Sequence, residues 1–302
     1  MADNLIYIPI VNFNHRLSKE YELGEGFSLV KFPKKFDVDY RTFGHSYFKR
    51  HYGDQFIKEA KDAYCLRYDW PGEGFRSIQE MIYKAEDPAI TFLIALRVVQ
   101  SCSAGFKMIF HTPSLKEKFP FDFAEYRMIG FQIRTSKAIH RFVEEDIFAA
   151  KEFFNKLLHL LKNEYKYRRI FNTLRYFDLG YRSANVDSRV IYFTIALEVL
   201  YKPSRGKITR VMAQRLSHFL GKDKKERDLL TEKTFEMMNF KARLTHGDMT
   251  YFDISRPERI QLVQEEEEVL RRTLQKILKN NDLIEMFSNL QSREEFFEGG
   301  IT

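Results

Sequence analysis

Hydrophobic and polar residues follow two different spacings along the chain, and the change falls near residue 143. Before that point, short apolar runs alternate with turn residues, and Gly24 and Gly26 mark a turn between the first two runs. Asp87-Pro88 resembles a helix start, and the apolar run that follows to about Gln100 is predicted to be a buried helix or a strand. The predicted strands are 5–13, 27–32, 106–111 and 127–134. Residues 1–143 are therefore predicted to form an α+β domain.

From Glu144 onward, apolar residues recur at helical spacing. The third predicted helix, 189–201, is apolar on nearly all sides, which is typical of the central helix of a bundle. Asp187-Ser188 precedes it as a cap, and the spacing from Ser255 to Glu258 predicts a capping box. The predicted helices are 144–161, 166–177, 189–201, 208–220, 224–245 and 256–279. Short loops between them predict an all-α bundle over residues 144–302.

The composition agrees with a folded chain of two domains. A length of 302 residues exceeds the usual size of one domain, and 44% hydrophobic residues exclude disorder as the main state. Cys65 and Cys102 are the only cysteines, too few for a disulfide framework or a metal cluster. The sequence shows no long apolar run and no leader pattern, so we expect a cytoplasmic protein with no membrane span and no cofactor.

Positive charge is concentrated in the middle of the chain. The net charge is +7, yet residues 151–215 hold 14 Lys and Arg against 5 Asp and Glu. Basic and aromatic residues interleave over 162–182, a pattern that RNA-binding proteins use and that an amphipathic helix with buried aromatics also produces. The candidate RNA-binding residues are Lys162, Lys166, Arg168, Arg169, Arg175 and Arg182.

Several sequence pieces in the second part occur in a recognisable order. ALEVLY at 196–201 is followed by QRLSHFLG at 214–221, then by a helix over 235–245 that ends in His246-Gly247-Asp248. With EEDIFAAKEFFNKL at 144–157 and LRYFDLG at 174–180, these pieces resemble the HEPN domain family, closest to its ApeA-like branch in prokaryotes. The resemblance covers about residues 144–280. It implies a HEPN-type helical bundle.

The resemblance also implies an activity. Active HEPN proteins are metal-independent ribonucleases with an R-x4-6-H motif, and two copies usually meet across a homodimer. Here the motif arginine position falls on Lys241, and the nearest arginine, Arg243, lies three residues before His246, on the same helical face. Either cation could serve, or the site is inactive. Asp248 either orients His246 or caps a turn, and His246 itself could simply cap the helix end.

The chemistry that such a site needs can be stated independently. RNA carries its own nucleophile, the 2′-OH, so cleavage requires a group that moves protons and a cation that stabilises charge on the phosphate. Histidine can move protons near neutral pH, and arginine can hold two phosphate oxygens. No metal is needed, and the product is a 2′,3′-cyclic phosphate.

Two further patterns concern the interior of the helical part. Glu198 stands inside an apolar helix, and a buried carboxylate must be paired, so we expect a structural ion pair with Arg215. The acidic run 265–268 is expected on the solvated face of the last helix or against a basic partner.

The sequence therefore predicts an RNA-directed HEPN protein, a metal-independent endoribonuclease in prokaryotic defence or toxin-like regulation. Its expected partners are RNA and a second copy of the chain. Two alternatives remain open: a catalytically inactive HEPN module for dimerisation, interaction or RNA binding, and a sensor of small ligands that uses residues 1–143. The motifs of P-loop, dinucleotide-binding, zinc-protease and serine-hydrolase sites are absent from the sequence.

Overall fold

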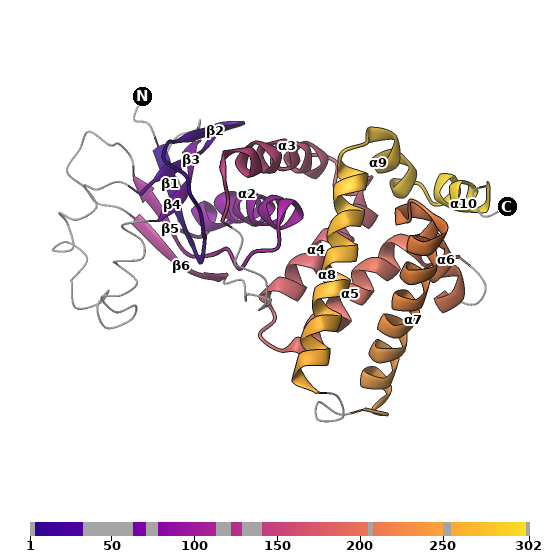
Figure 1. The fold of residues 1–302 in the computed structure, drawn as a ribbon. Coiled ribbons are helices and arrows are strands. Elements are labelled where there is room, and N and C mark those ends of the chain that lie inside the picture. Colours follow the sequence, from indigo (N-terminus) through magenta and orange to yellow (C-terminus); the bar gives the residue numbers. More distant parts are fainter. Residues whose placement is uncertain are drawn as a thin grey trace. The chain divides into compact units, whose positions relative to one another are not determined.

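A computed structural model describes residues 4–32, 63–70, 78–112, 122–128, 141–204, 208–249 and 255–299. The chain forms two compact units. The first comprises residues 1–96, 102–130 and 139–158, and the second comprises 97–101, 131–138 and 159–302. An α+β part is thus followed by a helical part, as the spacing of apolar residues predicts (Figure 1).

The first unit is built on an antiparallel sheet. Its strands are β1 (Asn4–Val11), β2 (Tyr21–Gly24), β3 (Phe27–Lys31), β4 (Tyr64–Trp70), β5 (Gly105–Thr112) and β6 (Asp122–Met128). They lie in the order β2-β3-β4-β1-β5-β6, and each neighbouring pair in the described chain is antiparallel. The predicted turn between β2 and β3 is confirmed, since Gly24 and Gly26 have positive φ angles of 99° and 80°. The last predicted strand begins earlier than expected, and its positions after Met128 lie outside the described residues.

Two helices complete the core of this unit, α2 (Ile78–Val99) and α3 (Glu144–Leu161). The ring of Phe154 in α3 lies 5.4 Å from that of Phe92 in α2 and 5.3 Å from that of Phe27 in β3. Most of α3 therefore belongs to the first unit, whereas the sequence prediction groups it with the bundle. Local spacing gives the helix, but it does not reveal which apolar surface its buried face meets.

The predicted start of α2 is also corrected. The helix begins ten residues before Pro88, and this proline lies inside it. Proline marks a helix start only when its missing N–H falls in the first turn, and in α2 the neighbouring apolar packing outweighs the lost hydrogen bond.

The second unit is helical. Its helices are α4 (Arg168–Arg182), α5 (Val186–Tyr201), α6 (Ile208–Leu220), α7 (Lys224–His246), α8 (Arg256–Leu278), α9 (Asn281–Ser288) and α10 (Leu290–Gly299). The prediction of a central third helix is confirmed, because α5 contacts α4, α6, α7 and α8. Helix α4 continues past Gly180 to Arg182, and the lack of a side chain at this glycine leaves room for the ring of Phe193 in α5. Helices α9 and α10 follow the last predicted helix and were not predicted from the sequence.

Helix caps confirm some local signals and correct others. The capping box of Ser255 and Glu258 is present at the start of α8. At the start of α5, Asn185 rather than Asp187 is the cap, and its side chain accepts a hydrogen bond from the Asp187 backbone N–H. Asp223 caps α7 through the backbone N–H of Glu226.

The acidic run of α8 does not lie wholly on a solvated face, so that expectation is wrong. Glu266 and Glu267 are buried. Glu266 accepts a hydrogen bond from the Thr194 hydroxyl, and Glu267 accepts one from the Tyr181 hydroxyl at 2.6 Å. These hydrogen bonds compensate the burial only in part, because the second carboxylate oxygen of Glu266 is buried without a hydrogen-bond partner among the described residues.

Candidate functional site

The C-terminal turn of α7 carries the predicted catalytic residues. The helix ends at His246, and Gly247 follows with a left-handed φ of 80°. The backbone N–H groups of Gly247 and Asp248 both bond to the Arg243 carbonyl. This glycine-terminated end leaves the His246 side chain exposed at the tip of the helix.

The structure separates the two cations that the sequence left as alternatives. The amine of Lys241 lies 2.6 Å from a carboxylate oxygen of Glu198, and each side chain keeps only about a fifth of its surface exposed (19% and 20%). Arg243 is exposed and lines a cavity of about 540 Å³ between α7 and α8, together with Glu258 and Glu265. Lys241 thus faces α5, whereas Arg243 faces α8.

His246 and Asp248 are not joined. Within the described part of the chain, the side chain of His246 has no hydrogen-bond or ion-pair partner, and Asp248 contributes only its backbone N–H to a bond. In the described chain Asp248 lies in the turn after α7 and forms no hydrogen bond with His246. Arg243 and His246 share one helical face, three residues apart.

The predicted ion pair between Glu198 and Arg215 is wrong. Arg215 forms a bidentate pair with Glu294 of α10, at 3.0 and 2.7 Å, and Arg293 adds a third bond to the same carboxylate at 2.6 Å. The fork of Arg215 lowers the pKa of Glu294 to about 2. Helix α10, which the sequence pattern did not reveal, supplies the acid, and Lys241 takes the place of Arg215 at Glu198.

The candidate RNA-binding residues divide into two groups. Lys166 pairs with Glu285 at 2.8 Å, Arg182 pairs with Asp178 at 2.8 Å, and Arg169 donates a hydrogen bond to the Val199 carbonyl. These three side chains are engaged within the fold. Lys162, Arg168 and Arg175 are exposed, as is the paired Lys166.

The aromatic residues around these cations divide in the same way. Tyr181 is fully buried, and Tyr167 is 8% exposed, as expected for an amphipathic helix with its aromatics in the core. Tyr165 is 84% exposed, and the Arg168 guanidinium lies 5.5 Å from its ring centroid. Both interpretations of the interleaved pattern thus apply, each to different residues.

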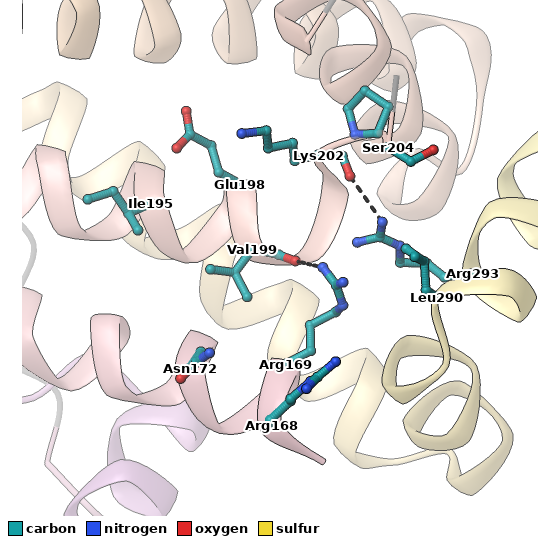
Figure 2. A pocket seen from close by; sticks show the side chains of 11 residues that line it. Arg168, Arg169, Asn172, Ile195, Glu198, Val199, Lys202, Ser204, Leu290 and Arg293 are labelled. Atoms are coloured by element: carbon teal, nitrogen blue, oxygen red, sulfur yellow. Dashed lines mark hydrogen bonds between the residues drawn. The ribbon is translucent and has the colours of Figure 1, made fainter. Parts of the chain in front are cut away.

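A basic cavity of about 470 Å³ lies among α4, α5 and α10 (Figure 2). Its charged lining residues are Arg168, Arg169, Glu198, Lys202 and Arg293. The sequence singled out the two arginines of α4, but Lys202 and Arg293 carry no local signal that separates them from other surface cations. Their role depends on the packing of α10 against the end of α5.

The backbone at the end of α5 holds two of these arginines. Arg293 donates hydrogen bonds of 3.1 Å to the carbonyls of Leu200 and Lys202, and Arg169 donates one to that of Val199. Figure 2 marks the bonds to Lys202 and Val199. These carbonyls lie at the negative end of the helix dipole, where cations are favoured. Burial and then the neighbouring Arg293 lower the pKa of Arg169 to about 10.

The described residues contain no group of three or more His, Cys, Asp or Glu side chains that could hold a metal ion. Among the helices that the structure describes, none has the length and apolar character needed to cross a membrane. The chain matches no protein-family model, and comparisons with curated proteins and with solved structures find no match either. The function is therefore inferred from the residues and their geometry.

Proposed function

We propose that this chain is an RNA-directed, metal-independent endoribonuclease of the HEPN type, acting in prokaryotic defence or toxin-like regulation. The single observation that carries the proposal is the exposed end of α7. There, Arg243 and His246 share one face, and neither side chain is bonded to another described residue. Lys241 is engaged by Glu198, which favours Arg243 as the cation of the site.

The chemistry follows from these two side chains. The guanidinium of Arg243 binds phosphate oxygens and stabilises the charge that builds up on them. His246 removes the proton of the 2′-OH or protonates the leaving 5′-oxygen, giving a 2′,3′-cyclic phosphate. One imidazole cannot serve as base and acid in the same step, so two copies are needed. We therefore expect a homodimer that brings two α7 ends together.

The test is RNA cleavage without divalent metal. We expect His246→Ala to lower the rate by about 10²–10⁴ while leaving RNA binding nearly intact, because binding depends mainly on Lys and Arg. His159→Ala is the matched control, since this exposed histidine lies in α3. Arg243→Ala should lower the rate more than the affinity, and EDTA should change neither.

Cleavage assays on the substitution Lys241→Arg can refute the proposal. Lys241→Arg restores the family motif and is expected to raise cleavage or leave it unchanged. If RNA survives prolonged incubation with both the native protein and Lys241→Arg, the protein is not a nuclease. Sizing by light scattering gives a second check, because a monomer of 36.1 kDa at micromolar concentration contradicts the two-copy site.

A second candidate function is a catalytically inactive HEPN-like module for dimerisation, interaction or RNA binding. The ion pair of Lys241 with Glu198 favours it, because that pair neutralises the cation at the motif position. The lack of a bond between Asp248 and His246 points the same way. RNA binding without any cleavage would identify this alternative.

A further inference from the structure

The basic cavity of α4, α5 and α10 contains more positive charge than its surroundings compensate. Four cations line it, two from α4, one from the end of α5 and one from α10. Glu198 is the carboxylate among the lining residues, and it is already paired with Lys241 at 2.6 Å. The cavity therefore keeps an excess of positive charge that an anion would relieve.

The placement of Arg168 and Arg169 is itself electrostatically unfavourable. They occupy the first two positions of α4, where the helix dipole is positive and acidic residues are preferred. The first turn holds no acid, and Tyr167 at the N-cap makes no side-chain capping bond. The Val199 carbonyl accepts a hydrogen bond from Arg169, whereas Arg168 is exposed and stacks near Tyr165.

The cations differ in what they can still bind. Arg293 is buried and donates to two backbone carbonyls and to Glu294, so it mainly holds the wall of the cavity. Arg168 and Lys202 are exposed, and in the described chain no hydrogen bond from either side chain is formed. Figure 2 shows these two side chains on different sides of the cavity, with Arg169 and Arg293 between the helices.

From these features we infer that the cavity binds a phosphomonoester, the terminal phosphate of a nucleotide or of an RNA chain. The exposed Arg168 and Lys202, which line the cavity from two sides beside Arg169 and Arg293, suit a group with three terminal oxygens and a charge of about −1.5 to −2 at pH 7. A phosphodiester offers two such oxygens and one charge. The apolar wall accommodates the attached sugar or base, and it consists of Ile195, Val199, Pro203 and Leu290.

The size of the cavity agrees with this ligand class. A volume of about 470 Å³ falls in the range of small-molecule sites. Asn172 and Ser204 also line the cavity and can bond to hydroxyl groups of a ribose. The cavity does not include Arg243 or His246, so the inference holds whether or not the protein cleaves RNA.

The test compares 5′-AMP with adenosine by isothermal titration calorimetry on the full chain. AMP is expected to bind saturably and adenosine at least about 10-fold more weakly, since charge-assisted hydrogen bonds to phosphate supply much of the affinity. The double variant Arg168→Ala/Lys202→Ala should weaken AMP binding by at least about 10-fold. The control Lys224→Ala/Lys225→Ala removes the same charge from exposed residues of α7 outside the cavity lining and should leave AMP binding unchanged.

Two RNA oligonucleotides distinguish the sources of the phosphate, one with a 5′-phosphate and one with a 5′-hydroxyl, and the second should bind as weakly as adenosine. Both carry 2′-O-methyl groups and therefore cannot be cleaved through the 2′-OH. Tighter binding of the 5′-phosphorylated oligonucleotide than of AMP identifies an RNA end, and the reverse identifies a free nucleotide. Equal binding of AMP and adenosine would overturn the inference. So would equal weakening by the cavity variant and by the control.

Discussion

The cluster of Arg215, Arg293 and Glu294 offers a sharp test of the fold, because one carboxylate is shared by two nearly buried cations. The side chains of Arg215 and Arg293 are 4% and 2% exposed, and that of Glu294 is 16% exposed. The substitution Glu294→Gln keeps the shape of the side chain and removes its charge. Two guanidinium groups then stay buried without their counter-charge.

The expected loss of stability follows from the pKa of Glu294, which the bond to Arg215 lowers from 4.5 to about 2. Each pKa unit is worth about 1.4 kcal/mol, so this lowering corresponds to roughly 3 kcal/mol. The exposed sixth of the side chain allows some screening, and we expect Glu294→Gln to reduce the free energy of unfolding by about 2–3 kcal/mol at pH 7.

Urea denaturation at several pH values is the assay. A lowered pKa stabilises the folded state above the unfolded value of 4.5, and this stabilisation is lost as the pH falls through 2. The difference between native protein and variant should therefore shrink to less than about half by pH 3. Glu298→Gln, an exposed substitution on the same helix, is the control and should cost less than about 0.5 kcal/mol.

Two results would refute this reasoning. If Glu294→Gln and Glu298→Gln unfold at the same urea concentration, the shared carboxylate does not stabilise α10. If the difference between native protein and Glu294→Gln stays constant from pH 7 to pH 3, the effect is not electrostatic.

Three more predictions concern the packing of the helical unit. Gly180→Ala should cost at least about 1 kcal/mol in urea denaturation, because its Cβ would lie 2.3 Å from the Phe193 ring; Gly299→Ala, with no atom within 4 Å, should be neutral. Asp178→Asn should cost about 3–5 kcal/mol, since it removes the carboxylate that is ion-paired with the fully buried Arg97, and an unchanged melting temperature would contradict the pair. Burial raises the pKa of Glu266 well above 4.5, so the native protein loses stability as the pH rises above 4.5. Glu266→Gln should therefore melt higher than native protein at pH 7 and equally at pH 4.

Local signals in the sequence predicted the features that depend on a few neighbouring residues. The capping box of Ser255 and Glu258 spans four residues, and the glycine after His246 ends α7 as expected. The central position of α5 followed from its nearly uniform apolar surface. Each of these features depends on residues of one helix or turn, so tertiary contacts did not change it.

Pairings between distant residues could not be predicted in the same way. The sequence predicted Arg215 as the partner of Glu198, but the packing of α7 against α5 places Lys241 there instead. The partner of Arg215 lies 79 residues away, in a helix that the pattern did not reveal. The basic cavity could not be predicted for the same reason, because it combines residues of α4 with Arg293 of α10, which is distant in the sequence.

The cations of the helical unit separate into those that hold the fold and those that can meet a ligand. Arg215 and Arg293 are nearly buried and bonded to a carboxylate or to backbone carbonyls, so their loss acts on stability. Arg168, Lys202 and Arg243 are exposed, and surface substitutions of this kind change stability by less than about 0.5 kcal/mol. A loss of RNA cleavage or nucleotide binding at the exposed group, in a protein that melts like the native chain, can therefore be assigned to the ligand. The same loss at the buried group would report unfolding instead.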